Sequence, residues 1–158
     1  MEDIRLHIMT RELCHEYFKE FQSDASIYMD MSKFSEYTYS ADKVDKYFDL
    51  QQADDRIVFM IMLKDKPIGE LKLKYIDKVK KECTLGIHLQ NDSVKGKGYG
   101  TVAEKMALEY AFKELGMKAV NADAVLKNKR SQHILEKLGF KYLKEDEMLK
   151  YYRYEFIK

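Results

Sequence analysis

The chain has 158 residues and is nearly balanced in charge, with 28 Lys and Arg against 27 Asp and Glu and a formal net charge of +1. A chain of this length suits one domain, and we expect residues 1–158 to form it. The balanced charge gives no overall field that would attract nucleic acid or an anionic membrane, so neither is expected as a partner. The two distant cysteines, Cys14 and Cys83, match neither a disulfide framework nor a metal cluster, and they favour the reducing cytoplasm.

The first half of the chain predicts a strand, two or three helices and three further strands. Residues 4–8 alternate between apolar and polar side chains, as a half-buried strand does. Helices are expected directly after Thr10 and Ser40, two favourable N-cap residues that precede apolar residues at helical spacing. A three-stranded meander follows at residues 56–63, 68–75 and 80–90, with a turn at Asp65-Lys66-Pro67.

The second half predicts the order helix, strand, helix, strand, strand. A helix of about four turns follows the glycine-rich stretch near residue 98 and ends near Gly116. This order predicts an α+β fold around a mainly antiparallel sheet, with one parallel crossover. The later elements are expected at 118–126 (strand), 128–138 (helix, stopped by Gly139), 140–143 (strand) and 149–157 (strand).

The glycine-rich stretch, residues 95–101, has the composition of an anion site. It reads Lys-Gly-Lys-Gly-Tyr-Gly-Thr and leads into a run of good helix formers. Glycine lets backbone N–H groups converge on one point, and a helix N-terminus adds free N–H groups and partial positive charge. The stretch therefore predicts a site for a phosphate compound.

Two segments resemble the GNAT family of N-acetyltransferases. The first runs from Leu85 to Gln90 and through residues 95–101, which are similar to the family's pyrophosphate loop, Gln/Arg-x-x-Gly-x-Gly/Ala. The second, from Asn128 to Phe140, resembles the Asn-x-x-Ser…Glu-Lys-x-Gly-Phe segment of the RimJ/RimL type. The resemblance implies a GNAT-like form of the α+β fold: a mixed, mainly antiparallel sheet of six to seven strands flanked by helices on both faces.

The resemblance also implies acetyl-CoA as co-substrate, bound between the third meander strand and the strand after the helix. Backbone N–H groups of the loop would then hold the pyrophosphate, and Leu89 and Gln90 would bond the pantetheine through their main chain. Asn128 would bind the CoA arm near its thioester, while Ser131 either contacts the cofactor or caps its helix. The implied cofactor-binding residues are Leu89, Gln90, Lys95, Gly96, Lys97, Gly98, Tyr99, Gly100, Thr101, Asn128 and Ser131.

The sequence departs from the family's pattern at two positions. Lys95 stands where the loop opens with Gln or Arg, and lysine donates to phosphate without the arginine fork. The position of the family's frequent general acid, a tyrosine seven residues after Asn128, is Leu135, as is common in the RimJ/RimL type. The proton for the leaving thiolate is therefore left to water or to another tyrosine, and the last strands carry Tyr142, Tyr151, Tyr152 and Tyr154.

Three residues of the meander are candidates for the base that acyl transfer to an amine requires. Glu70 falls on its second strand, Glu82 at the start of the third, and His88 in the middle of the third. Each has a structural alternative, a solvated carboxylate at a rim or a packed histidine. A one-residue shift in register reverses which side chains face the cleft, so the pattern leaves the choice open.

The acceptor side is expected in the least patterned part of the chain. Methionines and aromatic residues of the segment 28–39 either line an acceptor pocket or close the core. In the first case Asp24, Asp30 or Glu36 would attract a cationic amine.

The expected function is transfer of acetyl from acetyl-CoA to a primary amine by direct attack in a ternary complex. The acceptor is a protein N-terminus or a small-molecule amine, and a homodimer is the family-level expectation. One alternative is a catalytically inactive CoA-binding sensor or interaction module of the same fold. Another is a dinucleotide site, because Gly98 to Ala103 matches Gly-x-Gly-x-x-Ala and Asp123 lies on the next strand.

Overall fold

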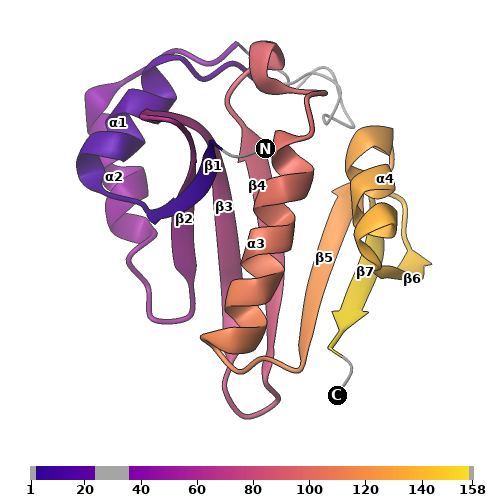
Figure 1. Ribbon diagram of the computed structural model, residues 1–158. Helices are drawn as coiled ribbons and strands as arrows, with labels where there is room; N and C mark the ends of the chain where they lie inside the picture. Colours follow the sequence, from indigo (N-terminus) through magenta and orange to yellow (C-terminus); the bar gives the residue numbers. More distant parts are fainter. Residues whose placement is uncertain (1–2, 24–35, 157–158) are drawn as a thin grey trace.

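The structure is a computed structural model that describes residues 3–23 and 36–156, and its centre is one mixed sheet (Figure 1). Seven strands of the described chain form this sheet in the order β1-β2-β3-β4-β5-β7-β6. The strands are β1 (Ile4–Ile8), β2 (Ile57–Leu63), β3 (Lys66–Asp77), β4 (Glu82–Leu89), β5 (Ala119–Val125), β6 (Lys141–Glu145) and β7 (Leu149–Glu155). The helices are α1 (Arg11–Lys19), α2 (Ala41–Leu50), α3 (Tyr99–Lys113) and α4 (Lys129–Leu138), with a short 3₁₀ turn, η3 (Asp92–Val94).

Helices α1 and α2 begin, and α4 ends, at the capping residues that the sequence predicts. The Thr10 hydroxyl accepts a hydrogen bond from the Leu13 N–H at 3.1 Å, and Ser40 caps α2 in the same way through the Lys43 N–H. Gly139 ends α4 with a φ of 103°, a left-handed conformation that glycine adopts without a Cβ penalty. The predicted caps at Thr10, Ser40 and Gly139 are confirmed.

Helices cover both faces of the sheet, as the alternation within β2 shows. Phe59 and Ile61 point to the face covered by α3 and join the larger core cluster. Val58, Met60 and Met62 point to the opposite face and pack with α1 and α2 in a second cluster. The predicted fold class is confirmed, and none of the helices in the described ranges is long and apolar enough to cross a membrane.

The sheet contains one parallel junction, between β4 and β5, and every other neighbouring pair of described strands is antiparallel. Helix α3 makes the crossover that joins these two strands (Figure 1). A doubly wound dinucleotide fold requires a mostly parallel sheet. The antiparallel meander excludes that interpretation of the glycine-rich stretch.

Candidate active site

A gap between β4 and β5 forms the candidate site. The two strands pair from Glu82 with Ala119 as far as Leu85 with Ala122, and beyond this point the pairing stops although both strands continue. A cavity of about 690 Å³ occupies the gap and is walled by β4, β5, the first turns of α3 and α4, and residues 21 and 22 after α1. The parallel junction therefore creates a V-shaped cleft that opens toward the glycine-rich loop.

The loop delivers an uncapped helix N-terminus to this cleft. Gly98 is the N-cap of α3 with a φ of 84°, and it offers no side chain to the free N–H groups of the first turn. Gly100 lies on the cavity wall, and a Cβ there would sit 3.8 Å from Ile87 and 3.9 Å from Ile134. A methyl group is accommodated at residue 100, whereas a large side chain would fill the cleft.

Basic side chains gather at the open end of the cleft. Lys95 lines it from the loop and forms an ion pair with Asp92 at 3.4 Å. Lys129 and Arg130 line it from the start of α4. Together with the helix N-terminus they suit a polyanion such as a pyrophosphate.

Asn128 and Ser131 both line the cleft, and it is Asn128, not Ser131, that caps α4. Asn128 is the N-cap of α4, and its Oδ1 accepts a hydrogen bond from the Ser131 N–H at 3.1 Å. Ser131 therefore does not cap its helix, which leaves its hydroxyl for the cavity. The other predicted loop residues contribute differently: Gly96, Lys97 and Gly98 are exposed, and Tyr99 and Thr101 are half-buried without lining the cavity.

The edge of β4 is the second surface of the cleft. The Gln90 N–H donates to the Ile68 carbonyl at 2.8 Å, on the β3 side of the strand. Because main-chain groups alternate in direction along a strand, those of Leu89 and Ile87 face the gap. Both residues line the cavity, and Ile87 is a contact that the sequence pattern missed.

Gln90 does not lie on the cavity wall, where main-chain bonds to the pantetheine would place it. Its carbonyl accepts from the Gln22 N–H at 2.9 Å, and its side-chain amide donates to the Tyr17 carbonyl at 2.8 Å. The residue is buried and is not part of the cavity wall. Gln90 therefore ties β4 to α1 rather than facing a ligand.

Of the three candidate bases, His88 is the one that lines the cavity. Its side chain is exposed to the cleft and lies opposite Glu70 across the β3–β4 pair. Desolvation by the surrounding protein lowers the pKa of His88 from 6.5, an effect that the nearby Glu70 opposes. The imidazole is therefore neutral at pH 7 and able to accept a proton.

Glu70 is buried under α2 and is not part of the cavity wall. Only 3% of the residue is exposed, and the Tyr47 hydroxyl lies 2.6 and 2.7 Å from its two carboxyl oxygens. Lys72 approaches one of these oxygens at 3.7 Å. Burial, followed by the charge of Glu70, raises the pKa of Tyr47 well above its usual value, so its hydroxyl stays a donor. Glu70 thus belongs to an internal polar cluster beneath the helices.

Glu82 lies at the opposite end of β4 from the loop. It accepts a hydrogen bond from Arg153 at 3.0 Å, which lowers its pKa, and contacts Asn121 at 3.4 Å. The structure therefore does not bring Glu82 to the cavity. Its ion pair links β4, β5 and β7 below the point where the cleft closes.

The tyrosines of the last strands also lie away from the cavity wall. The Tyr152 hydroxyl donates to Glu136 at 3.0 Å, and burial raises its pKa to about 12. The hydroxyl groups of Tyr142 and Tyr151 donate to Glu145 and Asp146 within the β6–β7 hairpin. A different titratable side chain does line the cleft: Glu104 of α3, which the sequence analysis did not single out.

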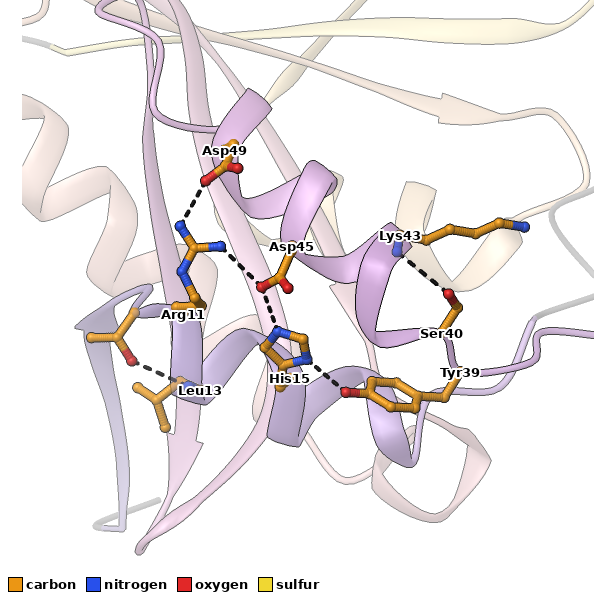
Figure 2. Close-up of polar contacts among 9 residues, drawn as sticks. Arg11, Leu13, His15, Tyr39, Ser40, Lys43, Asp45 and Asp49 are labelled. Atoms are coloured by element: carbon orange, nitrogen blue, oxygen red, sulfur yellow. Dashed lines mark hydrogen bonds and ion pairs between the residues drawn. The ribbon is translucent and has the colours of Figure 1, made fainter.

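An ionic cluster fixes α1 against α2 on the other face of the sheet. Arg11 of α1 forms ion pairs with Asp45 at 2.9 Å and with Asp49 at 2.7 Å, both on α2 (Figure 2). His15 bridges Asp45, at 2.8 Å, and the Tyr39 hydroxyl, at 2.6 Å. The cluster holds the two helices over the face that carries Glu70 and His88.

The segment between these helices starts at the cleft. Phe21 and Gln22, which follow α1, line the cavity beside His88. Of the predicted acceptor residues, Asp24, Asp30 and the methionines and aromatics up to residue 35 lie outside the described residues, whereas Glu36 is exposed. Within the described ranges, no cluster of three His, Cys, Asp or Glu residues is arranged to hold a metal ion.

The sequence as a whole matches a known family model. The model described as "Acetyltransferase (GNAT) domain" matches residues 4–141. The chain belongs to the GNAT acetyltransferase family. It is accordingly an acetyl-CoA-dependent N-acetyltransferase. A search among curated proteins gives no significant match to the sequence.

Solved structures of acetyltransferases show the same fold. A dodecameric spermidine N-acetyltransferase from Vibrio cholerae, in an intermediate state, has a TM-score of 0.74 and 17% identity over 98% of this chain and 95% of that one. A probable acetyltransferase has a TM-score of 0.77 and 21% identity over 98% and 94% of the two chains. The Vibrio cholerae spermidine N-acetyltransferase in complex with CoA and spermine has a TM-score of 0.73 and 16% identity over 98% and 96%.

Proposed function

We propose that this GNAT enzyme binds acetyl-CoA in the cleft between β4 and β5, with the pyrophosphate on residues 95–101, and transfers the acetyl group directly to a primary amine in a ternary complex. One observation carries the proposal: a single cavity is lined both by Gly100, in the first turn of α3, and by His88. Donor site and candidate base thus share one space. Acetyl-CoA supplies the acetyl group as an activated thioester.

The binding residues proposed for acetyl-CoA follow from their places on the cavity wall and at the N-terminus of α3. The N–H groups of Tyr99, Gly100 and Thr101 are the free donors of the first turn of α3. Lys95 adds positive charge beside them. The main chain of Leu89 lies along the gap, where it is suited to hydrogen-bond an extended arm in the way that an added strand does. Asn128 and Ser131 close the opposite side of the cleft.

His88 is the proposed base. A primary amine is mainly an ammonium ion at neutral pH and must lose a proton before it attacks. His88 is neutral, reaches the cavity and has Phe21 and Gln22 beside it. It accepts the proton of the amine, directly or through a water molecule, while the Tyr47–Glu70 pair stays internal.

The acceptor is proposed to be a polyamine-like or other cationic primary amine, with a protein N-terminus as the alternative. Two of the similar enzymes are named for spermidine, and one of them holds spermine in its structure. We further propose the RimJ/RimL-like subtype because the 128–140 segment has its form, with leucine at position 135. A single domain over residues 1–158, a homodimer and a cytoplasmic location complete the proposal.

Leu135 also favours a second candidate function, a CoA-binding sensor. Its side chain lines the cleft where the family's tyrosine acid is expected, and none of the last-strand tyrosines in the described chain replaces it. A sensor binds acetyl-CoA and does not release its thiol. The two functions therefore differ in turnover rather than in binding.

Thiol release from acetyl-CoA tests the proposal. The purified protein is incubated with spermidine, an aminoglycoside, or a peptide with a free N-terminus, and each acceptor is paired with its N-acetylated form as control. We expect thiol release with at least one free amine, no release with its blocked form, and an acetylated product of matching mass. Tight binding of acetyl-CoA with no release for any amine would support the sensor instead.

A further inference from the structure

Glu104 lies on the wall of the cleft, one helical turn beyond the loop. It follows Gly100 by four residues on α3, so the two share one face and are separated by about 6 Å along the helix axis. At Gly100 that face meets Ile87 of β4 and Ile134 of α4. Glu104 lines the same cavity together with Leu85 and Ala122, the last pair before β4 and β5 separate. Its carboxyl group therefore belongs to the closed part of the cleft.

The carboxyl group faces the cleft from apolar surroundings and has no partner among the described residues. Only 3% of Glu104 is exposed, and the core residues Ala103, Ala107 and Leu135 belong to the surrounding apolar cluster. Across residues 3–23 and 36–156, no side chain or main-chain group forms a hydrogen bond or an ion pair with it. No fully enclosed side-chain oxygen in these ranges lacks a partner, so the oxygens of Glu104 reach the space of the cleft. Burial alone raises the pKa of Glu104 from 4.5 to about 8, so the group keeps its proton at neutral pH. A protonated carboxyl group offers one O–H donor.

A carboxyl group in apolar surroundings with no protein partner is unfavourable for folding, and a leucine or methionine at this position on α3 would bury apolar surface instead. Titratable groups with strongly perturbed pKa values in a cleft cluster at functional sites, where a ligand can supply the missing partner. The cleft in front of Glu104 is the space proposed for the arm of acetyl-CoA. That arm carries amide and thioester carbonyl oxygens, which accept hydrogen bonds.

We infer that Glu104 is a binding residue for acetyl-CoA and that its carboxyl group, in the protonated form, donates a hydrogen bond to a carbonyl oxygen of the CoA arm. The inference rests on the proposed placing of acetyl-CoA in this cleft. The ionised form binds poorly for two reasons: it has no proton to donate, and it repels the phosphates of the ligand. Affinity for acetyl-CoA therefore falls as pH rises through the range in which Glu104 ionises.

Other groups on the cavity wall titrate or carry charge and have to be separated from Glu104. Burial is the single cause of its raised pKa, so none of them acts strongly on it. They are Lys74 of β3, His88 of β4, Asp92 of η3, Lys95 of the loop, Asp123 of β5, and Lys127, Lys129 and Arg130 at the start of α4. A substitution at Glu104 leaves all of them in place, so its effect on the pH dependence reports Glu104 alone.

Isothermal titration with acetyl-CoA between pH 6.5 and 9 tests the inference on three proteins. The ligand has no ionisable thiol, and calorimetry suits a chain without tryptophan. For the unmodified protein we expect a dissociation constant that rises about tenfold from pH 7 to pH 9, with proton uptake on binding at pH 8.5. Glu104→Gln keeps a donor but cannot ionise, so its affinity at pH 7 stays close to that of the unmodified protein, with a smaller rise toward pH 9 and less proton uptake. Glu109→Gln, on the exposed side of the same helix, behaves like the unmodified protein.

A fourth variant tests the hydrogen bond itself. Glu104→Met has similar length and no donor, and we expect it to bind acetyl-CoA about fivefold more weakly than Glu104→Gln at pH 7. Circular dichroism confirms that each variant is folded. Equal pH dependence in the unmodified protein and Glu104→Gln overturns the inference and leaves the proposed function standing. Failure of the unmodified protein to bind acetyl-CoA at any pH would overturn the proposed placing as well.

Discussion

Replacing Glu104 by glutamine should make the fold more stable at neutral pH and leave it unchanged in acid. In the folded protein the carboxyl group keeps its proton up to about pH 8, whereas in the unfolded chain it ionises from about pH 4.5. Between these values the unfolded state binds fewer protons than the folded one, so stability is fully present below pH 4.5 and is lost as pH rises. Each pH unit is worth about 1.4 kcal/mol. The loss reaches about 3 kcal/mol at pH 7, about 4 kcal/mol at pH 8 and about 5 kcal/mol well above pH 8.

Urea denaturation at pH 4.5, 6, 7 and 8 measures this effect on the unmodified protein and Glu104→Gln. The difference in free energy of unfolding between the two isolates Glu104, because every other titrating group is common to both. We expect that difference to grow in favour of Glu104→Gln by about 3 kcal/mol from pH 4.5 to pH 7 and to level off above pH 8. A difference that stays constant across this range would refute the conclusion that Glu104 is protonated in the folded protein.

Three further predictions concern the rest of the site. Gly100→Ala should retain acetyl-CoA binding, because a Cβ there makes ordinary contacts at 3.8 and 3.9 Å. Gly100→Phe should abolish binding in calorimetry while the protein stays folded. Unchanged affinity in Gly100→Phe would contradict the proposed site. His88→Gln should lower kcat about a hundredfold and abolish the fall in rate below pH 6.5, because the variant has no imidazole to accept the proton. Glu82→Gln is the control, since Glu82 lies away from the cavity, and it should leave kcat unchanged. The opposite pattern would assign the base to Glu82. Tyr47→Phe should lower the free energy of unfolding by about 2 kcal/mol in urea titrations, because the buried Glu70 carboxyl group loses its hydrogen-bond donor. A change near zero would show that water replaces the hydroxyl group.

The fold and the phosphate loop are largely predictable from the sequence, because each has a local cause. Thr10 and Ser40 are helix caps by their chemistry, and the continuous apolar run of residues 57–63 is typical of a strand that is buried on both faces. The glycines of residues 95–101 and the helix formers that follow predict the start of α3 in the same way. Each of these signals lies within a few neighbouring residues.

The sequence does not predict which candidate base reaches the cavity, because the residues that surround each one come from distant parts of the chain. Glu70 is buried by Tyr47 of α2, and Glu82 is neutralised by Arg153 of β7. Neither partner is recognisable from strand alternation, which gives the face of a side chain and not its cover. For Gln90 the resemblance implies main-chain bonds to the pantetheine, whereas in the structure its N–H and carbonyl groups are bonded to Ile68 and Gln22, two segments distant in the sequence.

Glu104 was missed although the sequence carried a signal for it. On α3 the buried small residues Gly100, Ala103, Ala107 and Ala111 recur at helical spacing, and Glu104 falls on the same face. A carboxylate in the middle of such an apolar stripe is an exception to the pattern that requires an explanation. The adjacent charged residues of the helix, which lie on its exposed side, concealed it among surface charges.

The placing of acetyl-CoA is the central claim, and a crystal structure of the protein with acetyl-CoA tests it most directly. We expect the pyrophosphate within hydrogen-bond distance of the N–H groups of residues 99–101 and the arm of the ligand beside Leu89 and Glu104 in the gap between β4 and β5. Acetyl-CoA bound elsewhere, with this gap filled by protein side chains or solvent, would contradict the account.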